Sequence, residues 1–144
     1  VKTHPRWLRV CDIKAPRTGL EVKFSYVFLA AMVFNGINTS SEKAYVDALC
    51  SDPVLRRLAE RVEVIRDESL NDTVANVAIT LTGGACIVVT HDLSAPIAPD
   101  LLERGLRAKC EGLLGAAMAG RLWQAMRDID RLPAAALGSL LGEV

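Results

Sequence analysis

Two basic side chains and a hydroxyl group precede the most apolar segment of the chain. Residues 16–26 read PRTGLEVKFSY and place Arg17 in a turn, with Lys23 and Ser25 at the start of a helix. The free N–H groups and the partial positive charge of a helix N-terminus attract anions. A guanidinium and an ammonium group at the same place add charge-assisted donors, which carboxylates accept well. The pattern therefore predicts a carboxylate-binding site.

Glu21 offers a competing explanation for the same stretch. Its carboxylate lies between the two cations in the sequence. On that interpretation Glu21 neutralises one cation locally, and the stretch does no more than start a helix. Charge alone does not decide between the two explanations.

The rest of the chain carries no strong catalytic signature. It contains no G-x-G-x-x-G, no P-loop and no G-x-S-x-G motif. His91 and Asp92 follow each other at a predicted strand end, where such pairs are usually solvated. Arg56 and Arg57 lie on a short predicted helix, and we interpret them as part of its solvated face.

Cysteine and histidine usage does not predict a metal site. The chain has four cysteines and two histidines. The cysteines lie far apart and form no C-x-x-C pair, so a zinc site would be hard to assemble. We expect reduced, buried thiols.

Length and charge exclude several classes of protein. A chain of 144 residues predicts one domain. Basic and acidic residues both number 17, whereas nucleic acids and anionic membranes select a cationic excess. The longest apolar run, residues 26–34, is shorter than the roughly 20 residues that cross a bilayer, and no secretory signal precedes it. We therefore expect a cytoplasmic protein with neither nucleic acid nor membrane as its partner and, because it begins with Val, a piece of a longer protein.

The periodicity of apolar residues predicts strands and helices in alternation. Strands are predicted at residues 7–13 and 62–66. Helices are predicted from residue 20 or 24 to 35, from 40 or 41 to 50, and from 53 after a capping Asp52.

A β-hairpin is the clearest local signal. Two apolar segments, residues 74–82 and 85–93, flank a Gly-Gly dipeptide that is typical of a two-residue turn. In that register Ile79 faces Val88, on the side that we assign to the core.

Two further helices are predicted after a Pro-rich connector, one from Pro99 and one through Leu122 and Met126, with a break at Pro133. The fold class is therefore α+β: a two-layer sandwich in a single domain, residues 1–144, with a mostly antiparallel sheet and helices packed on one face.

The order of these segments resembles the smaller, C-terminal domain of the MmgE/PrpD family. PRTGLEVKFSY leads into a small-residue apolar helix that ends in NG. The segment DPVLRRLAERVEV, a strand–glycine turn–strand unit, a Pro-containing link and the helix LLERGLRAKCEGLLG follow in the same order as in the family. The resemblance runs from about Trp7 to Leu141, and its specificity lies in the ordered set of segments.

This resemblance implies an enzyme similar in kind to 2-methylcitrate dehydratase, cis-aconitate decarboxylase and iminodisuccinate epimerase. Such lyases and isomerases act on small di- and tricarboxylates, as in propionate metabolism. They remove a proton next to a carboxylate and then lose water, lose carbon dioxide or take the proton back. The resemblance implies an active site between a large helical domain, absent from this chain, and the smaller domain. It also implies a homodimeric, cytoplasmic full-length enzyme without metal or organic cofactor.

The resemblance also assigns site residues. The substrate-binding residues of the smaller domain would be Arg17, Lys23, Ser25, Tyr26 and Phe28. The first three would bind carboxylates and take no part in acid–base catalysis. Many relatives carry a tyrosine at the place of Phe28, and Tyr26 lies two residues away. The acid–base groups of such enzymes lie mainly in the helical domain, so this chain is expected to be inactive alone.

Two other functions stay open. One is a stand-alone α+β module that binds a protein partner through the same surface. The other is a sensor that binds dicarboxylates without reacting. An open reading frame that extends roughly 250 residues upstream would favour the enzyme, at ordinary domain sizes.

Overall fold

A computed structural model describes residues 1–143 of the chain. Two compact units are present. The first comprises residues 1–39 and 43–95, and the second comprises residues 40–42 and the chain from Pro96 onward. Each unit is described by itself.

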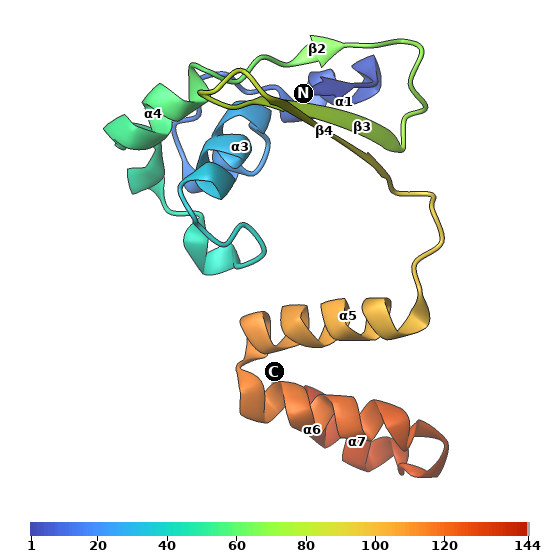
Figure 1. Ribbon diagram of the computed structural model, residues 1–144. Helices are drawn as coiled ribbons and strands as arrows, with labels where there is room; N and C mark the ends of the chain where they lie inside the picture. The colour runs from blue at the N-terminus through green and yellow to red at the C-terminus, as the bar shows by residue number, and fades with distance from the viewer. Residues whose placement is uncertain (144) are drawn as a thin grey trace. The chain divides into compact units, whose positions relative to one another are not determined.

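The first unit contains a mixed four-stranded sheet. Its strands are β1 (Lys2–Thr3), β2 (Ile65–Arg66), β3 (Val74–Thr80) and β4 (Cys86–Asp92), in the order β2-β1-β3-β4 (Figure 1). β1 pairs with β2 in parallel, and the β1–β3 and β3–β4 pairings are antiparallel. The predicted α+β class is confirmed, although the sheet is mixed.

The strand predicted at residues 7–13 is wrong, because a helix, α1 (Pro5–Cys11), occupies this segment. His4 is its N-cap, and Nδ1 of His4 accepts a hydrogen bond from the backbone N–H of Arg6 at 3.2 Å. Pro5 occupies the first helical position, where its fixed φ and missing N–H suit a helix start. This local start signal overrides the β-prone residues that follow.

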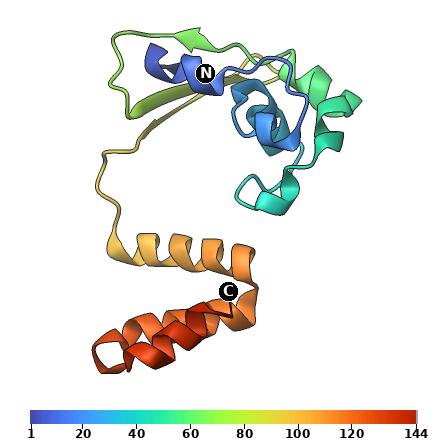
Figure 2. The same ribbon diagram turned by 180° about the vertical axis from the view of Figure 1, so that it is seen from behind.

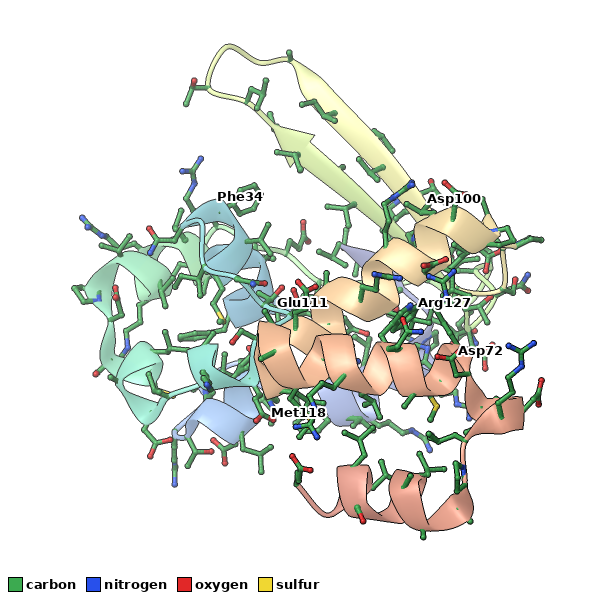
Figure 3. All side chains as sticks on the ribbon, turned by 90° about the horizontal axis from the view of Figure 1, so that it is seen from below. Phe34, Asp72, Asp100, Glu111, Met118 and Arg127 are labelled. Atoms are coloured by element: carbon green, nitrogen blue, oxygen red, sulfur yellow. The ribbon has the colours of Figure 1, made fainter. Side chains whose placement is uncertain are left out.

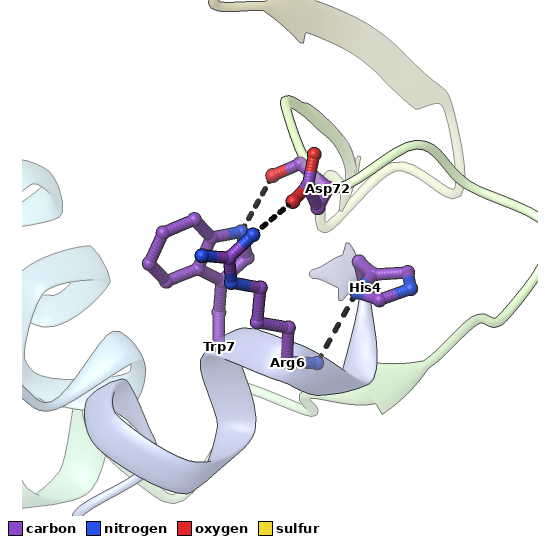
Figure 4. Close-up of polar contacts among 4 residues, drawn as sticks. All are labelled: His4, Arg6, Trp7 and Asp72. Atoms are coloured by element: carbon purple, nitrogen blue, oxygen red, sulfur yellow. Dashed lines mark hydrogen bonds and ion pairs between the residues drawn. The ribbon is translucent and has the colours of Figure 1, made fainter.

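The start of α1 is tied to the loop that precedes β3 (Figure 4). Nε1 of Trp7 donates to the backbone carbonyl of Asp72 at 2.5 Å, and the Arg6 guanidinium pairs with the Asp72 carboxylate at 2.5 Å. The same guanidinium lies over the Trp7 ring, 5.2 Å from its centroid. The two contacts with Asp72 join segments more than 60 residues apart.

Two helices replace the single one predicted to end at residue 35. They are α2 (Gly19–Val22) and α3 (Tyr26–Phe34). Ser25 interrupts the helical run because it adopts an extended conformation and caps α3. The predicted end is confirmed: Gly36 follows with φ 74°, in the left-handed region that favours glycine.

Two short 3₁₀ helices, η1 (Glu42–Ala44) and η2 (Asp47–Ser51), replace the helix predicted up to residue 50. Contacts with α2 explain the difference. Oδ1 of Asp47 accepts a hydrogen bond from the backbone N–H of Gly19 at 2.7 Å. A Cβ at Gly19 would lie 2.1 Å from the carbonyl oxygen of Tyr45, so only glycine permits this approach.

The predicted start of α4 (Pro53–Ala59) is confirmed. Oδ1 of Asp52 accepts from the backbone N–H groups of Val54 and Leu55 at 2.7 and 3.1 Å. α3 and α4 lie side by side in both views (Figures 1 and 2). Side chains from α2, α3, α4 and η2 form the core of the first unit: Val22, Val27, Phe28, Ala31, Met32, Cys50, Leu55 and Ala59.

The hairpin predicted from Gly83 and Gly84 forms, but in another register. Its loop has three residues, 82–84, closed by a backbone hydrogen bond from Leu81 N–H to the Ala85 carbonyl at 2.8 Å. Gly84 takes φ 84°, as a loop of this length requires at its last position. Ile79 consequently pairs with Ile87. The predicted pairing with Val88 is wrong, and one residue of shift moves each β4 side chain to the other face.

The second unit is helical. α5 (Pro99–Leu114) and α6 (Ala116–Arg127) pack against each other and run antiparallel (Figure 3). They are followed by η3 (Ile129–Arg131) and α7 (Ala134–Leu141). The predicted helix start at Pro99 is confirmed. Arg107 of α5 lies over the Trp123 ring of α6, 4.7 Å from its centroid.

Large apolar side chains remain exposed in both units. Val88 of β4 is 67% exposed, and Phe34 is 53% exposed. Phe34 lies at the end of α3 and is labelled in Figure 3. Leu101, Leu102, Leu106 and Leu113 of α5 are also exposed. No helix between residues 1 and 143 combines the length and apolar character that spanning a membrane would need.

Candidate functional site

Glu21 is hydrogen-bonded to the backbone of the loop that carries Arg17. Its Oε2 accepts from the backbone N–H of Arg17 at 2.6 Å. Within residues 1–143, Glu21 forms no ion pair with Arg17 or Lys23. The structure therefore favours a Glu21 that holds the loop in place over one that neutralises a cation by direct contact.

Lys23 is positioned by an aromatic ring. Its Nζ lies 4.9 Å from the centroid of the Tyr45 ring. The Tyr45 hydroxyl donates to the carbonyl of Thr39 at 2.7 Å, which fixes the ring. A ring face attracts an ammonium group without cancelling its charge. Lys23 is exposed, so its charge is accessible to an anion in solution.

Ser25 is the N-cap of α3. Its side chain is 0% exposed, and its Oγ accepts from the backbone N–H of Phe28 at 3.3 Å. The N-terminal N–H of Phe28 is therefore already occupied. In this structure Ser25 sets the direction of α3 and has no exposed atom with which to meet a ligand.

Tyr26 begins α3 and is half-buried. Burial raises the pKa of its hydroxyl above the ordinary value, and contact with Cys11 and the Asp12 carboxylate adds to the rise. A hydrogen bond with Thr3 opposes the rise in pKa. Tyr26 is consequently a neutral hydroxyl at physiological pH, tied to the start of the chain.

Phe28 lies in the core and also lines a pocket of about 640 Å³ in the first unit. The pocket lining comes from α3, η2, the α4 region, residues 14–16 and residues 62–64. Four charged residues line it: Lys14, Arg56, Glu60 and Glu63. Arg17 follows the lining residue Pro16 directly. Of the five predicted site residues, however, Phe28 alone contributes to the lining.

Arg56 lines the pocket and is exposed, in agreement with its interpretation as part of a solvated helix face. Its Nε donates to the carbonyl of Cys50 at 2.8 Å. The neighbouring Arg57 does not line the pocket, and its Nε donates to the carbonyl of Pro53 at 3.3 Å. Helical spacing separates the two arginines, because Arg56 shares a face with the buried Ala59 three residues later. That spacing was readable in the sequence once α4 was assigned.

Of the two cations in the pocket lining, Lys14 has an acidic partner, and Arg56 forms no ion pair within residues 1–143. The ammonium group of Lys14 pairs with Asp12 at 2.5 Å. Glu63 lies near the charged N-terminus, whose ammonium group donates to the Glu63 carbonyl at 2.6 Å. Glu60 has no ion pair with any residue from 1 to 143.

No three His, Cys, Asp or Glu side chains among residues 1–143 lie close enough together to hold a metal ion.

Comparison with known proteins adds no assignment to this geometry. The chain matches no family model, and no curated protein matches it.

Proposed function

We propose that this chain is the smaller domain of a lyase or isomerase of the MmgE/PrpD kind, and that it binds the carboxylates of a small di- or tricarboxylate substrate. The observation that carries the proposal is the pair of cations before α3. Arg17 and Lys23 are both exposed, and neither forms an ion pair within residues 1–143.

The local structure supports a binding role for these cations. Glu21 holds the backbone of the Arg17 loop, Tyr45 positions the Lys23 ammonium, and the Ser25 cap sets the start of α3, which follows both cations. Cations held in place in advance lose less entropy when an anion binds. They also stabilise the negative charge that develops when a proton is removed next to a carboxylate.

The chemistry itself belongs to a second domain in this proposal. The helical domain implied by the family resemblance would supply the general acid and base, and the full-length enzyme would be a cytoplasmic homodimer without cofactor. Apolar side chains next to the cations fit such a junction, since Leu20 is 65% exposed and Phe24 is 39% exposed. Exposed apolar groups beside charged ones are typical of surfaces that another domain covers.

A protein-interaction module is the second candidate function. The observation that favours it is β4, where Ile87, Val88 and Val89 are exposed on both faces of the strand. β4 lies at the edge of the sheet, and an edge strand with exposed apolar side chains pairs readily with another chain. Such a module would bind a partner through β4 and would not respond to carboxylates.

The full-length protein provides the deciding experiment. Purified enzyme is incubated with methylcitrate, cis-aconitate and iminodisuccinate, and loss of water, release of carbon dioxide and change of configuration are followed separately. Turnover of one of these acids, abolished in an Arg17→Ala/Lys23→Ala variant, supports the proposal. An upstream reading frame too short for a helical domain, together with no turnover, contradicts it.

A further inference from the structure

We propose that Arg56 binds one carboxylate of the substrate in the pocket that Phe28 and Pro16 line, and so determines which acids are accepted. This inference rests on the proposed function and adds a residue to it. Nothing in the family resemblance that we described assigns Arg56 a role.

The anchoring of Arg56 prepares its guanidinium for this role. Its Nε is bonded to the carbonyl of Cys50, which fixes the plane of the group. Its two terminal nitrogens form no hydrogen bond or ion pair within the described part of the chain. A fixed guanidinium with two parallel free donors fits a carboxylate in a bidentate arrangement.

The pocket suits a small acid. Its volume of about 640 Å³ lies within the range of about 300 to 1,000 Å³ that small-molecule sites occupy. Val27, Phe28 and Val62 provide apolar lining for a carbon chain. The guanidinium provides the polar contact that would fix the orientation of the ligand.

The acidic residues of the pocket limit it to one carboxylate. Glu60 and Glu63 lie in the lining, and Lys14 already has Asp12 as a partner. A second ligand carboxylate inside the pocket would be repelled by these groups. The remaining carboxylates must therefore lie outside the pocket, and the exposed, unpaired Arg17 lies next to the lining residue Pro16. The substrate would thus have carboxylates at both ends of a short carbon chain.

In the test, the 144-residue chain is titrated with citrate and with glutarate at low ionic strength. Binding is monitored by calorimetry and by amide NMR shifts. Arg56→Ala is expected to weaken citrate binding about tenfold or more, the loss typical of one charge-assisted contact. Arg57→Ala is the matched control and should leave the affinity unchanged. Amide shifts at Phe28 and Ala59 should accompany binding and disappear in Arg56→Ala. Equal effects of the two substitutions would overturn the inference.

A further variant and a comparison with Arg17 and Lys23 keep the result interpretable. Arg56→Gln retains donors for the Cys50 carbonyl, so a loss of affinity without a loss of thermal stability is expected. Citrate binding that depends on Arg17 and Lys23 but not on Arg56 would overturn this inference and leave the proposed function standing. Binding that depends on Arg56 alone would contradict the role of Arg17 and Lys23 in the proposed function, and would leave only the contact between Arg56 and a carboxylate standing. Absence of citrate binding in the unaltered chain would overturn both.

Discussion

Oε2 of Glu21 accepts a hydrogen bond from the backbone N–H of Arg17, and the two side chains form no ion pair. The acidic residue between two cations therefore acts on the backbone. This arrangement keeps the loop before α2 in place and leaves the guanidinium for another partner.

Glu21→Ala should lower the free energy of unfolding by about 1 kcal/mol, because one hydrogen bond that closes the loop is lost. Glu21→Gln keeps an acceptor for the Arg17 N–H and removes the charge, so it should preserve most of the stability. Urea denaturation of both variants checks this. Equal stability of the unaltered chain and Glu21→Ala would show that the hydrogen bond to the Arg17 N–H does not stabilise the loop.

Gly19→Ala should destabilise the first unit by at least about 1–3 kcal/mol, the usual cost of forcing extra atoms into a packed site. The new Cβ would meet the carbonyl of Tyr45, a backbone atom that cannot turn aside. Gly83→Ala is the control, because a Cβ there meets nothing within 4 Å. A thermal melt that shows the same midpoint for both variants would contradict the close approach of α2 to residues 45–47.

Ser25→Ala should lower the free energy of unfolding by about 1 kcal/mol through loss of the α3 cap. Ser25→Asp retains an acceptor for the Phe28 N–H but places a larger, charged group at a fully buried position, so it should cost at least as much. Because the hydroxyl is buried, citrate affinity of the folded Ser25→Ala molecules should not change. A large drop in affinity at unchanged stability would instead show that Ser25 contacts the ligand.

Stability should fall at high pH because of Tyr26. Burial raises the pKa of its hydroxyl above the ordinary 10.0, so the folded state keeps a proton that the unfolded state has already released. The contribution is complete below about pH 10 and is lost as the pH rises through the folded pKa. Tyr26→Phe should flatten the decline above about pH 10. Tyr45, whose pKa burial also raises, contributes in the same direction, so Tyr45→Phe serves as the comparison.

The parts of the fold that sequence reasoning predicted have short-range causes. Asp52 with Pro53 starts α4, Gly36 follows the end of α3, and Pro99 starts α5, because each signal acts within one helical turn. The strand predicted at residues 7–13 failed because a cap at His4 outweighed β propensity.

The parts that could not be predicted depend on contacts between distant segments. The 3₁₀ helix η2 forms where the Asp47 carboxylate meets the Gly19 N–H, 28 residues away in sequence. The short strand β1 forms only because β2 and β3 lie on either side of it. The anchoring of Arg56 in the pocket lining depends on the position of the Cys50 carbonyl, which no sequence pattern indicates. No local pattern carries such information.

The most direct test of the central claim is the salt dependence of citrate binding by the 144-residue chain. Arg17→Ala/Lys23→Ala is compared with Arg9→Ala/Arg57→Ala, a control that removes the same charge from exposed positions outside the site. The account predicts saturable binding that weakens with salt, with an affinity about tenfold or more lower in the first variant and unchanged in the second. Equal affinities in the two double variants, or a response to citrate that salt does not alter, would contradict it.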